Sequence, residues 1–258
     1  MFISIWQKEI RGSLYTWKGM LWLVIASLLF SFTSYLLLTN QELSLLDQTE
    51  MMWLLGKIII GVALLIVTID AASIITTEFE KETVETLFLS PLSLKDFILG
   101  KLFASLTLWA SIFIISIPYI IVTSTGSNLI GAFIIYTGIL GTLGTTGLIF
   151  FIFGVSLLYR STKNTLTTSL ILLLALAIPA LFSSTLKINT VSQLFSILNP
   201  VDNIFSALDN ILVDYHTAVF ENWRFLLPLI IFCLATFAFM AFSMWQFKKQ
   251  GVIRHESS

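Results

Sequence analysis

The chain has 258 residues, of which 57% are hydrophobic and only 11% charged, and its mean hydropathy is +0.93. An apolar share well above the roughly 50% of a soluble domain excludes a soluble globular protein and indicates an integral membrane protein. The formal net charge of −1 leaves no excess of positive charge, so no nucleic-acid partner is expected.

The first element in chain order is an amphipathic segment at residues 2–18. Apolar side chains recur on one arc at helical spacing, with basic side chains on the opposite side. The arc consists of Phe2, Ile3, Trp6, Ile10, Leu14 and Trp17, and the basic side of Lys8, Arg11 and Lys18. This pattern predicts an interfacial helix in the headgroup layer. A plain cytosolic extension of the first span is the alternative.

Six apolar runs then reach the length of about 20 residues that a membrane-spanning helix needs. They cover residues 19–39, 52–75, 101–123, 128–157, 165–183 and 225–247. The first run lacks a small-residue cleavage site, so we expect it to stay as an anchor. Strands of a membrane barrel have only about 10 residues. The sequence therefore predicts an all-α integral membrane fold, with residues 1–258 as one transmembrane domain.

The distribution of Lys and Arg predicts the orientation, because cytosolic flanks retain positive charge. One set of flanks carries Lys8, Arg11, Lys18, Lys81, Lys95, Lys101, Arg160, Lys163, Lys248, Lys249 and Arg254. The opposite loops carry only Lys187 and Arg224. We therefore expect a multi-pass protein of the cell membrane with cytosolic N- and C-termini.

A charged segment at residues 78–89 separates the second and third spans and is compatible with a helix that ends before Pro91. On that helix an acidic stripe faces one side and less polar residues face the other. The stripe consists of Glu78, Glu82 and Glu85, and the other side of Phe79, Thr83, Val84 and Leu87. This arrangement fits a docking surface for a basic partner. It fits a solvated loop helix equally well.

The same segment carries an ordered motif that ends in a Gly-Lys pair. Its residues are Glu78, Glu80, Lys81, Thr83, Val84, Glu85, Leu87, Phe88, Pro91, Gly100 and Lys101. The motif resembles the loop between spans two and three of type 2 ATP-binding-cassette (ABC) exporter permeases, in which this helix docks into a cleft of the ATPase subunit. Glu82 stands where many such permeases have Gly.

The resemblance implies a permease half of an ABC exporter that works with a cytosolic ABC ATPase and a second permease subunit, the same chain or a related one. The coupling residues would be Glu78, Phe79, Glu82, Thr83, Glu85, Leu87 and Pro91. No cofactor is expected in this chain, and ATP and Mg would bind to the partner ATPase. The expected substrate is amphiphilic or hydrophobic, such as a peptide, a lipid or a drug, moved out of the cytosol or inner leaflet.

The resemblance also implies that residues 184–223 fold back into the outer leaflet. Two amphipathic series in this segment flank the break at Asn199-Pro200. They consist of Val191, Leu194, Phe195 and Leu198, followed by Ile204, Phe205, Leu208, Ile211 and Leu212. A re-entrant hairpin is tolerable at membrane depth only when it packs against protein. A hairpin lying on the outer surface is the alternative.

Inside the spans, two features call for interpretation. Span four contains Gly131, Gly138, Gly141, Gly144, Gly147 and Gly154, and small residues at such spacing let another helix approach closely. We expect close packing here rather than a hinge.

Asp70 lies near the end of span two, and we expect it to be hydrated or to bond its neighbours, with a transport role as the alternative.

The sequence has no phosphate-binding loop, no H-E-x-x-H zinc pair and no CxxC motif. The chain is therefore expected to be a transport subunit rather than an enzyme, with ATP hydrolysis on a separate polypeptide. A secondary transporter or channel without an ATPase partner is the alternative function, although we find no inverted repeat of the kind such carriers show. An intramembrane enzyme is the least favoured class, since Asp70 has no evident catalytic partner.

Overall fold

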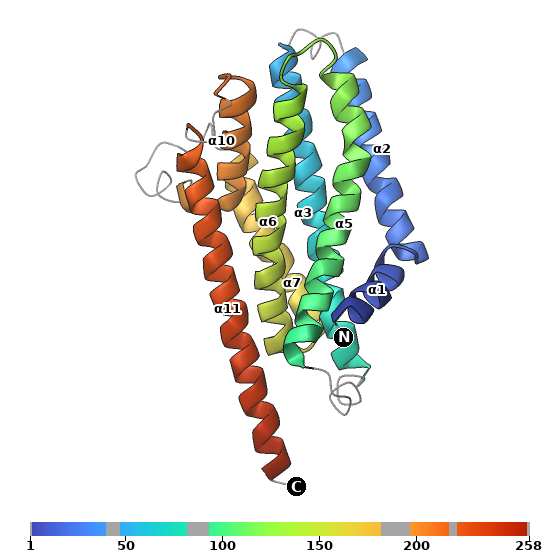
Figure 1. Ribbon diagram of the computed structural model, residues 1–258, viewed down its shortest axis with the longest axis vertical. Coiled ribbons are helices and arrows are strands. Elements are labelled where there is room, and N and C mark those ends of the chain that lie inside the picture. Colours follow the sequence, from blue (N-terminus) through green and yellow to red (C-terminus); the bar gives the residue numbers. More distant parts are fainter. Residues whose placement is uncertain (1, 40–46, 82–92, 182–196, 217–220, 257–258) are drawn as a thin grey trace.

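The computed structural model describes residues 2–39, 47–81, 93–181, 197–216 and 221–256. These ranges form eight α-helices and contain no strand (Figure 1). The helices are α1 (Phe2–Ser13), α2 (Trp17–Thr39), α3 (Gln48–Glu80), α5 (Leu94–Thr123), α6 (Ile130–Tyr159), α7 (Thr162–Leu181), α10 (Pro200–Leu212) and α11 (Trp223–Glu256). The all-α fold class is thus confirmed.

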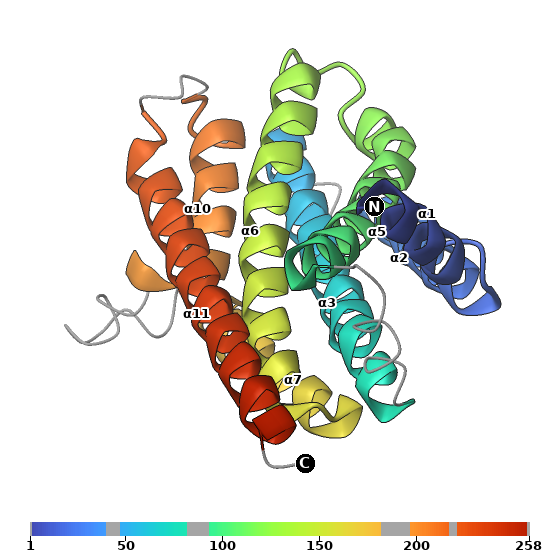
Figure 2. The same cartoon turned by 60° about the horizontal axis from the view of Figure 1, so that its bottom comes forward.

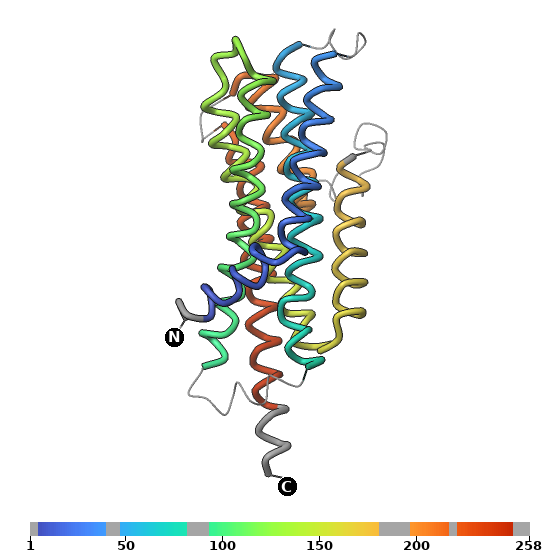
Figure 3. The backbone as a smooth tube through the Cα atoms, turned by 90° about the vertical axis from the view of Figure 1, so that its right-hand side faces the viewer, coloured from blue at the N-terminus to red at the C-terminus, as the bar shows by residue number. Residues whose placement is uncertain are grey.

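Six of these helices are long and apolar enough to cross a membrane, as the sequence predicts: α2, α3, α5, α6, α7 and α11. They pack side by side into an elongated bundle (Figure 1). The N-terminal helix α1 and the C-terminal end of α11 lie at the same end of this bundle, which we call the terminal end (Figure 3). The short helix α10 lies at the opposite end, which we call the α10 end.

Helix α6 occupies the middle of the bundle, where α3, α5, α7, α10 and α11 all contact it. Its glycines make these contacts possible. A Cβ atom at Gly147 would lie 2.6 Å from the ring of Phe232, and one at Gly154 would lie 2.6 Å from the ring of Phe239, both on α11. Close approach of α11 to α6 is therefore the role of these glycines, in agreement with the packing interpretation.

Helix α10 begins at the Asn-Pro pair. The Asn199 side chain accepts hydrogen bonds from the backbone N–H groups of Val201 and Asp202, and Pro200 takes the first helical position. The Asn199 amide also donates to the carbonyl of Leu176 on α7, at 2.8 Å. One side chain thus starts α10 and attaches it to a neighbouring span.

Along its length α10 packs against α3, α6, α7 and α11, and its apolar residues Ile204, Leu208 and Ile211 are fully buried. Helix α10 is therefore packed within the bundle, and the re-entrant hairpin over residues 184–223 stays a prediction. Of the first series in that segment only Leu198 is described, since Val191, Leu194 and Phe195 lie outside the described residues.

The N-terminal segment differs from the single helix expected at residues 2–18. Helix α1 ends at Ser13, and α2 begins at Trp17, whose side chain is 82% exposed. The chain reverses so tightly between them that a Cβ atom at Gly19 would overlap the backbone of Ser13. The turn arises because α1 lies against α5 while α2 runs along the bundle (Figure 1). Helical periodicity alone does not reveal this break.

Candidate coupling site

The last turn of α3 leads directly into the segment predicted to dock on an ATPase. Three consecutive side chains of this turn contact three other helices. Glu78 is paired with Lys101 of α5 at 3.2 Å, and the ring of Phe79 packs edge-on against Phe247 of α11, with 5.6 Å between ring centroids. Glu80 accepts a 2.7 Å hydrogen bond from the backbone N–H of Thr162, at the start of α7.

Lys101 is the centre of this arrangement because its side chain is fully buried. Its ammonium group donates to a carboxylate oxygen of Glu9 at 3.0 Å, to Glu78 at 3.2 Å and to the carbonyl of Ile74 at 2.6 Å. These bonds use all three of its donors. A buried charge is tolerated only when it is paired in this way. Lys101 therefore joins α1, α3 and α5 through one group.

Gly100 explains how α1 reaches this position. A Cβ atom at residue 100 would lie 2.7 Å from Cγ2 of Ile5, so any larger residue would push α1 away from α5. About two helical turns further along α5, Thr107 accepts a hydrogen bond from the indole N–H of Trp6 at 3.2 Å. Figure 2 shows α1 lying across α5 at the terminal end. The Gly-Lys pair of the motif thus forms part of the surface of α5 on which α1 packs.

Phe247 receives a second contact besides Phe79. The guanidinium of Arg160, which ends α6 in a left-handed conformation, lies 5.0 Å from the centre of the Phe247 ring. Cation–π contacts of this kind add attraction between elements beyond apolar packing. The ring therefore lies between the end of α3 and the end of α6, and it brings α11 into the same group of contacts.

A polar cavity of about 390 Å³ opens beside Lys101 at the terminal end. Asp70 lines it and is 8% exposed, and the hydroxyl of Ser13 donates to its two carboxylate oxygens at 3.3 and 3.4 Å. Lys18 lines the same cavity and donates to the hydroxyl of Ser73 at 3.5 Å. The sequence-based expectation that Asp70 bonds its neighbours is confirmed. Its partner, however, comes from the N-terminal helix.

The structure describes two of the seven predicted coupling residues, Glu78 and Phe79. The other five, Glu82, Thr83, Glu85, Leu87 and Pro91, lie outside the described residues. One boundary needs correction. Helix α3 runs without interruption to Glu80, so residues 78–80 form its last turn and not the start of a separate helix. The apolar run ends near Ile75, but the contacts of Glu78, Phe79 and Glu80 with other helices keep the helix intact beyond it.

Sequence reasoning missed the roles of Glu9, Glu80 and Phe247. A signal was present for the first of these, because Lys101 opens an apolar span and a buried ammonium group needs acidic partners. No feature of the sequence around Glu9 or around Lys101 identifies Glu9 as that partner. Within the described ranges, no group of three or more His, Cys, Asp or Glu side chains is placed to hold a metal ion.

An all-helical bundle with six membrane-length helices among the described residues fits the membrane subunit of a transporter. The chain belongs to the ABC-2 family of transporter proteins, whose model matches residues 3–252. It is a membrane permease subunit of the ABC transporter class. No curated protein matches the chain.

Proposed function

We propose that this permease is half of the membrane part of an ATP-driven exporter, in which two permease subunits assemble with two cytosolic ABC ATPase subunits. ATP and Mg bind to the ATPases, and this chain converts their movement into a rearrangement of its spans. The substrate is amphiphilic or hydrophobic, a peptide, a lipid or a drug, and leaves the cytosol or inner leaflet. Membership of the ABC-2 family supports the ATPase partnership.

The observation that carries the proposal is the set of contacts in the last turn of α3. Residues 82–89 follow this turn directly, and Glu78, Phe79 and Glu80 connect it to α5, α11 and α7. Glu9 extends the connection to α1 through Lys101. A force applied to the predicted docking segment would therefore act on several spans at once, as coupling of ATP hydrolysis to transport requires.

The proposed orientation places the terminal end in the cytosol. Helix α1, the start of α7 and the C-terminal part of α11 lie at this end of the bundle, and these segments carry Lys8, Arg11, Lys163, Lys248 and Lys249. Retention of positive charge on the cytosolic side is the strongest determinant of membrane topology. The docking segment follows the C-terminus of α3, which lies at the terminal end of the bundle. In this orientation it meets an ATPase in the cytosol.

The first test is purification of the tagged chain from native membranes in mild detergent, with mass spectrometry of the proteins that accompany it. We expect a stoichiometric ATPase with a phosphate-binding loop, and ATP hydrolysis that vanadate inhibits. A pure chain with no ATPase and no activity would contradict the proposal and favour a channel or a secondary carrier.

The second test addresses the docking segment itself. Glu82→Lys combined with Glu85→Lys should weaken ATPase association while insertion and permease dimerisation persist, because the acidic stripe would face the basic surface of its partner with the wrong charge. The control is Glu42→Lys with Asp214→Lys, an equal change of charge in the loops that the sequence predicts to be on the outer side. Unaltered ATPase binding by the first pair would rule out this docking surface.

A further inference from the structure

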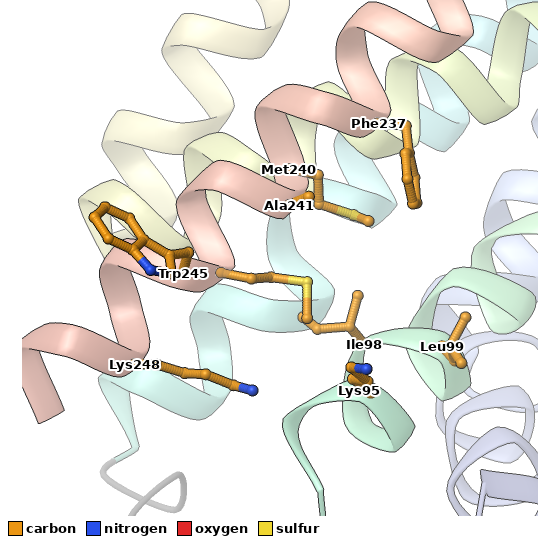
Figure 4. Close-up of a pocket in the computed structure, with 9 residues that line it drawn as sticks. Lys95, Ile98, Leu99, Phe237, Met240, Ala241, Trp245 and Lys248 are labelled. Atoms are coloured by element: carbon orange, nitrogen blue, oxygen red, sulfur yellow. The ribbon is translucent and has the colours of Figure 1, made fainter. Parts of the chain in front are cut away.

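A groove of about 450 Å³ lies between the first turns of α5 and the last part of α11. Its walls are apolar: Ile98 and Leu99 come from α5, and Phe237, Met240 and Met244 come from α11. Figure 4 shows these side chains lining the space between the two helices. The volume is that of a ligand-sized pocket. It is large enough for a segment of an acyl chain.

The groove opens toward the membrane. Both helices belong to the membrane-length set, and the lining residues Leu99 and Phe237 remain 45% and 50% exposed. In a bilayer such exposed apolar side chains meet lipid chains and not water. A flexible acyl chain can fill a hollow in this surface, and filling is favourable because an empty hollow leaves its lining atoms without dispersion contacts.

One end of the groove is cationic. Lys95, in the first turn of α5, and Lys248, on α11, both line it and both are exposed. Lys248 reaches from α11 toward the turn that carries Lys95 (Figure 4). Among the residues that the structure describes, neither lysine is paired with a carboxylate. Two ammonium groups at the rim of an apolar hollow create an attraction for an anion attached to a hydrocarbon.

The position of this rim agrees with a lipid headgroup. Trp245 lines the groove one helical turn before Lys248, at the point where the apolar run of α11 gives way to the Lys248-Lys249 pair. Tryptophan and lysine are enriched at the level of the headgroups. The rim therefore lies at headgroup depth, and the apolar walls lie at the depth of the acyl chains.

We propose that this groove binds one anionic phospholipid of the leaflet next to the terminal end, with its phosphate between Lys95 and Lys248 and an acyl chain along Met240 and Phe237. The binding of this lipid requires only that the helices span a membrane. It does not rest on the exporter proposal. The bound lipid would join α5, which carries Lys101, to α11, which carries Phe247, and so stabilise the terminal end of the bundle.

The test uses native mass spectrometry of the purified full chain, with equal amounts of phosphatidylglycerol and phosphatidylcholine in the detergent. We expect the wild-type chain to retain phosphatidylglycerol preferentially. Lys95→Gln combined with Lys248→Gln should lower this preference about fivefold for each lysine, or about 25-fold together. The control is Lys8→Gln with Lys163→Gln, which removes the same charge from exposed positions that do not line the groove. It should leave the preference within about twofold of wild type.

A second variant separates the groove from surface charge in general. Ala241 lines the groove and is exposed, so Ala241→Phe fills the hollow without disturbing the buried core. It should displace the lipid while both lysines remain. Ala235→Phe places the same side chain on an exposed position of α11 outside the groove and should have no effect.

Equal lipid preference in the lysine pair and its control would overturn the proposal, as would undiminished binding in Ala241→Phe. Loss of a copurifying protein from the lysine pair, with lipid binding unchanged, would assign the groove to a protein partner and would also overturn it. Because lipid binding is measured on the isolated chain, failure of the exporter proposal would leave this result unaffected.

Discussion

At the terminal end of the bundle, a fully buried cation joins the helices through ion pairs, whereas at the α10 end amide and indole groups join them through neutral hydrogen bonds, and the cations Lys57 and Arg224 there are only half-buried and exposed. Lys101 joins α1, α3 and α5 through two carboxylates and a carbonyl. At the α10 end, Asn199 bonds the carbonyl of Leu176, and the indole N–H of Trp53 donates to the carbonyl of Phe205 at 3.1 Å. Asn210 and Asn222 bond each other at 2.9 Å.

This difference has consequences for how each end tolerates change. Lipid tails are as apolar as the spans, so apolar contact between spans brings little hydrophobic gain, and packing with polar bonds decides which helices associate. Removal of one member of a buried ion pair costs far more free energy of unfolding than the intact pair contributes, because the remaining charge stays buried without its partner. A neutral hydrogen bond leaves no such buried charge, so each one can be lost separately. The terminal end should therefore respond to single substitutions as a unit, and the α10 end residue by residue.

The largest effect is expected from Lys101→Met. This change removes the buried cation that the carboxylates of Glu9 and Glu78 share, which should cost about 3–5 kcal/mol of unfolding free energy. The measurement is unfolding of the detergent-solubilised chain by a denaturing detergent. The triple variant Glu9→Gln, Glu78→Gln, Lys101→Met removes all the charges and should regain most of the loss.

Lys57→Met at the other end provides the matched control for this comparison. Lys57 is only half-buried, and its ammonium group stacks 3.3 Å from the centre of the Trp53 ring. Its loss should cost about 0.5–2 kcal/mol. If Lys57→Met were as destabilising as Lys101→Met, the contrast between the two ends would not hold.

A smaller effect is expected in the middle of the bundle, where Gly147→Ala would place a methyl group 2.6 Å from the ring of Phe232. Overpacking of this kind costs about 1–3 kcal/mol. Gly131→Ala is the control on the same helix, because a Cβ atom there meets nothing within 4 Å. It should change the unfolding free energy by less than about 0.5 kcal/mol, because the added methyl group meets no other atom. Similar melting temperatures for the two variants would argue against close packing of α11 on α6.

At the α10 end, Asn199→Ala removes the cap of α10 and its bond to α7 together. Loss of a capping side chain costs about 0.5–2 kcal/mol. Local opening should be visible as faster amide hydrogen exchange in α10, with exchange in α1 and α5 unchanged. Faster exchange at both ends would show that the two ends are not independent.

The smallest effect is expected from Glu80→Gln. The amide oxygen can still accept the hydrogen bond from the Thr162 backbone N–H, and only the charge at the start of α7 is lost. That charge contributes about 0.3–1 kcal/mol at a helix N-terminus. Glu80→Leu, which removes the acceptor too, should destabilise the chain more than Glu80→Gln does. Equal unfolding midpoints for these two variants would show that this hydrogen bond contributes nothing.

Much of the fold follows from local properties of the chain. The lengths of the apolar runs match the thickness of a bilayer, and Asn199-Pro200 is a helix start that depends on nearby residues alone. The glycines of α6 identify an interface, since no other residue type permits the approach of Phe232 and Phe239. The coupling site could be predicted only in part, because the motif identifies Glu78, Gly100 and Lys101 but not the residues that they contact.

What the sequence by itself determined is the class of the protein: an all-helical permease, with its spans set by hydropathy and its family by a match over residues 3–252. Only the tertiary structure decided that α1 turns back at Ser13 onto α5, that α3 continues to Glu80, and that Lys101 finds Glu9. The reason is physical. Hydropathy and capping act between close neighbours in the chain, whereas a buried charge selects its partners from whatever the fold brings near, here across 92 positions.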